Sequence, residues 1–249
     1  MIDLVNVNVF PTKLEASNAA ADRAAKILQS ALDTKSTVCF VAATGASQFD
    51  FLESLCKHDE IDWKRTEMFH LDEYIGLSAT HPASFRYYLN KRLIEKIHPG
   101  KINFIKGDAI NTALECKRIS EIISKKIIDI AFIGIGENGH LAFNDPPADF
   151  ETKAPYLIVE LDEQCRKQQV GEGWFNSIEE VPEKAISMSI NQILKAKNII
   201  CTCPEKRKAK AVRECLLKSS PITPIHPASI LKVHNNVYCY LDKDSASLL

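Results

Sequence analysis

The sequence predicts one α/β domain with a modified doubly wound, mostly parallel sheet and helices on both faces. Two observations support this fold class. Strand-like and helix-like segments alternate through most of the 249 residues, and the strand-like segments are continuously apolar, as parallel strands buried on both faces are. No repeat, low-complexity run or Gly/Ser linker divides the chain. We therefore expect a single Rossmann-like domain over residues 1–249.

The first half of the chain begins with residues 5–10, which alternate at period two and predict a strand. Thr12 and Glu15 fit a capping box, and they open a helix over 12–32 whose alanines and leucines share one face. The remaining segments of this half predict the following elements: a strand at 36–45, a helix at 46–57, a strand at 65–72, a helix at 82–97, a short strand at 101–107 and a helix at 112–126.

The second half begins with the most apolar strand, at 127–136. The segment at about 145–176 is rich in Pro, Gly and polar residues, and we expect an active-site insertion there. The rest predicts these elements: a helix at 183–196, a strand at 197–203, a helix at 205–219 and a strand at 236–242.

Composition excludes several classes of function. The net charge is −1 and the pI about 6.7, which argues against nucleic-acid or membrane-surface binding by bulk electrostatics. Eight cysteines form no Cys-x-x-Cys pair, so we expect buried thiols in a reducing compartment and no metal site. The N-terminus lacks the pattern of a signal peptide, and no apolar run reaches about 18 residues. We expect a cytoplasmic protein.

Residues 134–139, GIGENG, match the dinucleotide pattern Gly-x-Gly-x-x-Gly. That site requires a helix running on from the glycines, but Pro146 and Pro147 would stop one within about two turns. No strand with an acidic end lies about 20 residues further on. A plain turn explains the glycines but not the polar residues that crowd this strand end, which are Asn138, His140, Asn144 and Asp145. We interpret the loop as a functional site other than a nucleotide site.

Two other strand ends carry candidate groups. Asp72 and Glu73 end the strand at 65–72, where a half-buried carboxyl would suit a general base, although Asp72 could instead cap the following turn. Residues 44–47, Thr-Gly-Ala-Ser, join a strand to a helix and could cradle an anion with backbone N–H groups. Lysine and arginine residues at 206–210 begin a later predicted helix, where the helix dipole disfavours positive charge. Their position indicates a bound anion that offsets them, and the alternative is a solvent-exposed charged face.

Four stretches together resemble the glucosamine-6-phosphate deaminase (isomerase) family: "FHLDEYIGL" with "HPASF", "GIGENGHLAFNDP", "VPEKAISMSI" and "KRKAKAV". The resemblance runs from about Val38 to the last strand. It implies a modified doubly wound fold and conversion of glucosamine 6-phosphate to fructose 6-phosphate and ammonia. The family reaction uses no redox cofactor and needs only a small sugar-phosphate partner.

The resemblance also implies site residues. Asp72 matches the carboxylate that moves a proton from C2 to C1, and His140 the histidine that assists ring opening. Asp145 stands where the family usually has Glu beside that histidine, and Asn138 where many members have Asp. The family's phosphate-binding Arg is missing from "GEGWF", and Arg166 is the nearest substitute. The implied phosphate site consists of Thr44, Gly45, Ala46, Ser47, Arg166 and Lys208.

Two alternatives remain at this point. The same superfamily contains 6-phosphogluconolactonases, whose motifs tend toward "DER" and "GHTASLF" where this chain has "DEY" and "GHLAFND". A non-catalytic sugar-phosphate sensor is the second, because of Asp145 and the missing Arg. The sequence is compatible with a homo-oligomer and does not decide the sugar epimer.

Overall fold

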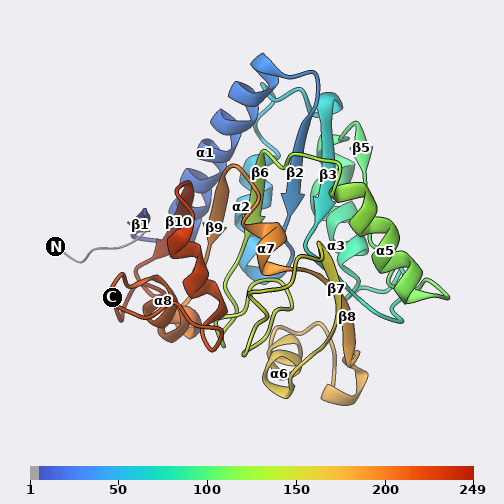
Figure 1. Ribbon diagram of the computed structural model, residues 1–249. Coiled ribbons are helices and arrows are strands. Elements are labelled where there is room, and N and C mark those ends of the chain that lie inside the picture. The colour runs from blue at the N-terminus through green and yellow to red at the C-terminus, as the bar shows by residue number, and fades with distance from the viewer. Residues whose placement is uncertain (1–5) are drawn as a thin grey trace.

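The computed structural model describes residues 6–249, and it confirms the predicted α/β fold class (Figure 1). Within these residues a parallel sheet runs in the order β1-β10-β9-β6-β2-β3-β5. Val5, the first residue of the predicted N-terminal strand, lies outside the described residues. The strands are β1 (Val7–Phe10), β2 (Val38–Ala42), β3 (Thr66–His70), β5 (Lys101–Ile102), β6 (Ile130–Ile133), β9 (Ile199–Thr202) and β10 (Val237–Asp242).

Helices cover both faces of this sheet, and each face has its own apolar core. One face packs against α1 (Lys13–Thr34), α2 (Phe49–Leu55), α3 (Phe85–Leu89), the π-helical turn η3 (Asn90–Ile94) and α4 (Glu95–Ile97). The other face packs against α5 (Thr112–Ile123), α7 (Ile190–Ile193), α8 (Ala209–Leu216) and the 3₁₀ helix η6 (Pro227–Val233). The predicted Thr12–Glu15 capping box is present at the start of α1.

The order of the strands in the sheet determines where a ligand-binding crevice can form. From β2 the chain moves outward to β3 and β5, then returns to β6 on the opposite side of β2 and continues to β9 and β10. The loops that follow β2 and β6 therefore diverge from neighbouring strand ends. This reversal opens a crevice at the carboxyl ends of the strands, where open α/β sheets bind ligands.

A second, antiparallel sheet in the order β4-β8-β7 lies beside this edge, and it corrects one prediction. The segment 183–196, predicted as one helix, forms strand β8 (Lys184–Met188) followed by the short α7. β8 lies between β4 (Asp72–Tyr74) and β7 (Tyr156–Glu160). Since both faces of β8 are covered, its residues after Lys184 are all buried and carry no alternation that marks a strand.

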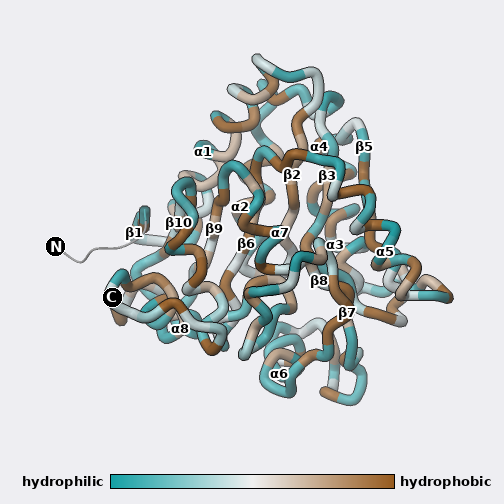
Figure 2. The backbone as a smooth tube through the Cα atoms, in the orientation of Figure 1, coloured by the Kyte–Doolittle hydropathy of each residue, from teal (hydrophilic) through white to brown (hydrophobic). Residues whose placement is uncertain are grey.

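Residues 145–176 supply β7 and the helix α6 (Glu163–Gly171), which lies beyond the carboxyl ends of the parallel strands (Figure 1). That this segment is an insertion stays a prediction. In Figure 2 hydrophobic residues follow the inner strands, whereas α6 is mostly hydrophilic. All eight cysteines are free thiols, and six of them are buried. Within residues 6–249, no helix has both the length and the apolar character needed to cross a membrane.

Candidate active site

A cavity of about 70 Å³ lies at the carboxyl ends of the central strands. The sequence-predicted residues that line it come from four separate loops or strand ends, after β2, β3, β6 and β9. They are Thr44, Gly45, Ser47, Asp72, His140 and Lys208. The structure thus brings together the predicted base, the predicted imidazole and most of the predicted phosphate site.

Asp72 is one of the two acidic residues that line this cavity. It begins β4 and is 6% exposed. Burial, together with the charge of the neighbouring Glu73, raises the pKa of Asp72 well above its usual range. A carboxyl group with a raised pKa can both accept and release a proton near neutral pH, as proton transfer between two carbons requires.

Glu73, by contrast, has a structural position. Its carboxylate accepts hydrogen bonds from Ser84 Oγ at 2.8 Å, from Phe85 N at 3.1 Å and from Arg86 N at 3.0 Å. Arg86 Nε also donates to it at 3.2 Å. These donors satisfy the buried carboxylate and tie β4 to the start of α3, so Glu73 fixes the strand that carries Asp72.

His140 is held in a tight loop after β6. Gly136 N donates to the His140 carbonyl at 3.0 Å, and His140 N donates to Asn138 Oδ1 at 3.1 Å. The imidazole lies directly against Gly136, where a Cβ would be only 2.3 Å from His140 Cε1 and Nε2. Gly136 of the GIGENG motif is therefore required by the imidazole, not by a nucleotide.

The carboxylate of Asp145 lies next to the imidazole of His140. His140 Nδ1 is 3.1 Å from Asp145 Oδ1, but the ring nitrogen has no partner in hydrogen-bond geometry. Burial would raise the pKa of Asp145, yet the His140 ring, the Asn138 amide at 3.0 Å and the Asp162 N–H at 3.3 Å outweigh it and lower the pKa. The Asp145 side chain is thus a carboxylate anion next to the His140 ring. Asn138 contacts both residues, because its amide donates to Asp145 and its oxygen accepts from His140 N.

The predicted anion cradle combines the loop after β2 with Lys208, and residues of both line the cavity. Gly45 has φ +98, a conformation that favours glycine, and directly precedes the 3₁₀ helix η1 (Ala46–Gln48). Lys208, 3% exposed, ends the 3₁₀ helix η5 (Lys206–Lys208). Burial, together with the charge of Arg207, lowers the pKa of Lys208. A bound phosphate would add a negative charge that favours the protonated form of Lys208.

Three cavity residues come from the α6 segment and were not predicted from the sequence: Gln168, Gln169 and Glu172. The Glu172 carboxylate accepts hydrogen bonds from Arg207 Nη1 at 2.8 Å, Gln168 Nε2 at 2.9 Å and Trp174 Nε1 at 3.1 Å. Burial would raise its pKa, but Arg207 and Gln168 lower it. An internal carboxylate therefore occupies the same cavity as Lys208. Nothing in "GEGWF" by itself signals this, because the charged partner, Arg207, comes from a distant segment.

Two residues of the predicted phosphate site, Arg166 and Ala46, do not line the cavity. The Arg166 guanidinium donates to the carbonyls of Ile178 at 2.7 Å and Val181 at 3.1 Å, and it does not line the cavity. It fixes the end of the α6 segment instead of reaching the predicted phosphate site. Ala46 lines a neighbouring hollow beside Arg207.

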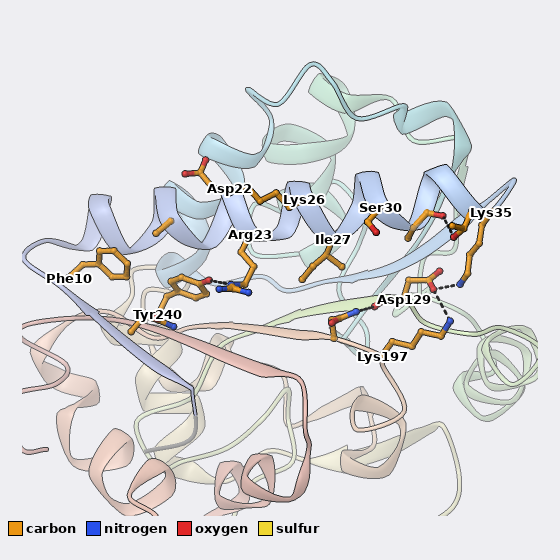
Figure 3. Close-up of a pocket in the computed structure, with 15 residues that line it drawn as sticks. Phe10, Asp22, Arg23, Lys26, Ile27, Ser30, Lys35, Asp129, Lys197 and Tyr240 are labelled. Carbon is orange, nitrogen blue, oxygen red and sulfur yellow. Dashed lines mark hydrogen bonds and ion pairs between the residues drawn. The ribbon is translucent and has the colours of Figure 1, made fainter. Parts of the chain in front are cut away.

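A larger groove of about 720 Å³ lies between α1 and the β1 side of the sheet (Figure 3). Arg23, exposed on α1, points into it and donates to Tyr240 Oη at 2.7 Å. At its far end Asp129 binds Lys35 and Lys197. Asp129 precedes β6, so this end of the groove is opposite to the carboxyl ends of the strands. The groove is larger, but it lacks an acid–imidazole pair, so we assign the site to the smaller cavity.

Comparisons with known proteins show which family the chain resembles. The sequence model of the family described as glucosamine-6-phosphate isomerases/6-phosphogluconolactonase matches residues 11–239. Glucosamine-6-phosphate deaminase of Thermoanaerobacter sp. (strain X514) is 35% identical, with 91% of this chain and 90% of the relative covered. The enzyme of the same name from Clostridium acetobutylicum is 34% identical, with 91% and 94% covered.

Solved structures show the same likeness. A monomeric glucosamine-6-phosphate deaminase superposes with a TM-score of 0.90 at 31% identity, covering 98% of this chain and all of the other. A 6-phosphogluconolactonase from Thermotoga maritima superposes with a TM-score of 0.77 at 14% identity, covering 95% and 99%. At that identity the second likeness shows the fold alone.

Proposed function

The chain belongs to the family of glucosamine-6-phosphate isomerases and 6-phosphogluconolactonases, and from this premise we propose that it is a glucosamine-6-phosphate deaminase. The observation that carries the proposal is the opening of Asp72, His140 and Lys208 into one cavity. The relatives at 34–35% identity that carry this name support the choice of reaction within the family.

The proposed reaction assigns each group one task. Lys208 and the loop residues Thr44, Gly45 and Ser47 hold the phosphate. His140, oriented by Asp145, moves the proton that opens the sugar ring. Asp72 then takes the proton from C2 of the open-chain amino aldose and returns it to C1, which gives the ketose imine. Water adds to the imine, and fructose 6-phosphate and ammonia leave.

The small cavity volume bears on how the substrate enters. About 70 Å³ is well below the roughly 300 Å³ at which ligand pockets begin. Gln168, Gln169 and Glu172 form the side of the cavity that comes from α6. A hexose phosphate therefore needs more room than this cavity provides.

Incubation with glucosamine 6-phosphate tests the proposal, with ammonium and fructose 6-phosphate measured as products. In deuterium oxide the recovered hexose phosphates should also carry deuterium at C1 or C2, because Asp72 exchanges its proton with solvent. A parallel incubation with 6-phosphogluconolactone tests the lactonase alternative. Lactone hydrolysis without ammonium release would replace the deaminase assignment. Binding of fructose 6-phosphate without any turnover would indicate a sugar-phosphate sensor.

A further inference from the structure

Cys165 lies beside the His140–Asp145 pair, and the proposed reaction gives its thiol no task. It is on the first turn of α6 and is 1% exposed. One potential ligand atom from each of Cys165, His140 and Asp145 lies within 4.8 Å of the other two. Among residues 6–249 this is the only group of three or more histidine, cysteine and acidic side chains with that closeness.

The imidazole supplies a second, independent observation. His140 is 8% exposed, and its Nδ1 atom is buried with no hydrogen-bond partner, although Asp145 Oδ1 is only 3.1 Å away. Buried polar atoms are rarely left unpaired in folded proteins, so each such atom calls for an explanation. A cation between the imidazole and the carboxylate would give the His140 nitrogen a partner, whereas Asp145 Oδ1 already accepts a hydrogen bond from Asn138 Nδ2 at 3.0 Å.

A further carboxylate lies beside the cluster. Asp162 accepts a hydrogen bond from Cys165 N through its side chain, and its own backbone N–H donates to Asp145 Oδ2 at 3.3 Å. Two carboxylates, those of Asp145 and Asp162, therefore lie next to the thiol and the imidazole, and their negative charge attracts a divalent ion.

We propose that Cys165, His140 and Asp145 form a binding site for a soft divalent cation of the Zn²⁺ type. An imidazole nitrogen, a thiolate sulfur and a carboxylate oxygen are the three donor types that Zn²⁺ takes in proteins, whereas Mg²⁺ and Ca²⁺ take oxygen. Zinc bonds of about 2.0–2.3 Å place tetrahedral ligands roughly 3.3–3.8 Å apart, so the cluster needs to contract by about 1 Å or a little more.

The chemistry of binding is an exchange of protons for the metal. Cys165 releases its thiol proton to solvent and binds as thiolate, Asp145 binds as the carboxylate and His140 binds as the neutral imidazole. No electron is transferred. Three protein ligands leave a fourth position for a water molecule. The site departs from the sequence expectation of no metal, because its ligands follow no cysteine spacing.

The consequence is inhibition, and this half of the inference rests on the proposed function. A metal bound to His140 removes the imidazole from ring opening and anchors α6 through Cys165. Sugar turnover should therefore fall as Zn²⁺ rises, and a chelator should restore it. Metal binding itself does not depend on which reaction the enzyme catalyses.

Metal-free wild type and Cys165→Ser are compared by Co²⁺ titration, with thiolate-to-cobalt absorption in the near ultraviolet as the signal. Cys239→Ser serves as the matched control, since Cys239 is equally buried and contacts Cys201 outside the site. We expect saturable absorption in the wild type and in Cys239→Ser, and none in Cys165→Ser. Calorimetry with Zn²⁺ should show at least about tenfold weaker binding to Cys165→Ser, because even outer partners of a metal site cost ~10–100-fold.

Activity assays complete the test. Cys165→Ser should keep the metal-free turnover and lose sensitivity to Zn²⁺ by the same factor, while Mg²⁺ should inhibit neither protein. Absorption that persists in Cys165→Ser, or that disappears in Cys239→Ser, would overturn the site. Should the wild type release no ammonium, the proposed function fails, while cobalt absorption and calorimetry still decide the metal site.

Discussion

Replacement of Gly136 by alanine should remove most of the turnover while leaving the fold intact. A Cβ at this position would lie 2.3 Å from both Cε1 and Nε2 of His140 and 2.4 Å from Nδ1. Ordinary carbon contacts are about 3.5–4.0 Å. The imidazole must therefore move by more than about 1 Å, away from Gly136 and from its place beside Asp145.

The size of the effect follows from this displacement. A shift of about 1 Å in a catalytic group can cost on the order of 100-fold in rate. Overpacking of a well-filled site costs about 1–3 kcal/mol of stability, which a domain with a usual margin of about 5–15 kcal/mol tolerates. Lys208 and the loop after β2 are not displaced, so fructose 6-phosphate binding should survive.

The assay is ammonium release under saturating glucosamine 6-phosphate, with calorimetry for fructose 6-phosphate and thermal unfolding alongside. Gly134→Ala is the matched control in the same loop. Its Cβ would lie 3.1 Å from Nε2 of Gln48, so that amide needs to move by only a few tenths of an ångström, and none of the atoms nearest to this Cβ belongs to His140. Wild-type turnover in Gly136→Ala would refute the assignment of His140. An equal loss in both variants would show that the loop, and not the imidazole, is responsible.

Three further predictions use other parts of the structure. Asp72→Asn should abolish deuterium exchange yet raise the melting temperature at pH 7, because a raised native pKa means that ionisation of Asp72 destabilises the fold. The gain in melting temperature should vanish as the pH falls to about 4, because Asp72 is then protonated in the unfolded chain as well. A melting temperature of Asp72→Asn below that of the wild type at pH 7 would contradict the prediction. Glu172→Gln should tighten phosphate binding on the order of fivefold, about 1 kcal/mol, because it removes a carboxylate from the cavity that contains Lys208. Glu137→Gln is the control: it removes a more exposed carboxylate that pairs with the same Arg207, and it should change phosphate binding less. Arg23→Ala should leave kcat/KM unchanged, and a large loss would move the active site to the groove of Figure 3.

Much of the site could be predicted because its groups stand at strand ends. Asp72, His140 and residues 44–47 each follow an apolar strand, and parallel strands place their carboxyl ends at one edge of a sheet. The sequence also contains the capping box at Thr12, since its hydrogen bonds span only three residues. Local patterns of this kind depend on neighbours along the chain and are visible before folding.

The tertiary structure decided what depends on distant partners. Strand β8 exists because β4 and β7 pair with it on both sides, although its own residues also suit a helix. Arg166 turns to backbone carbonyls, and Arg207 holds Glu172 in the cavity across a gap in sequence that no local pattern spans. The sequence by itself determined which chemical groups lie at the sheet edge. Packing determined which of them face one another, because contact energies between remote segments are realised only when the chain is folded.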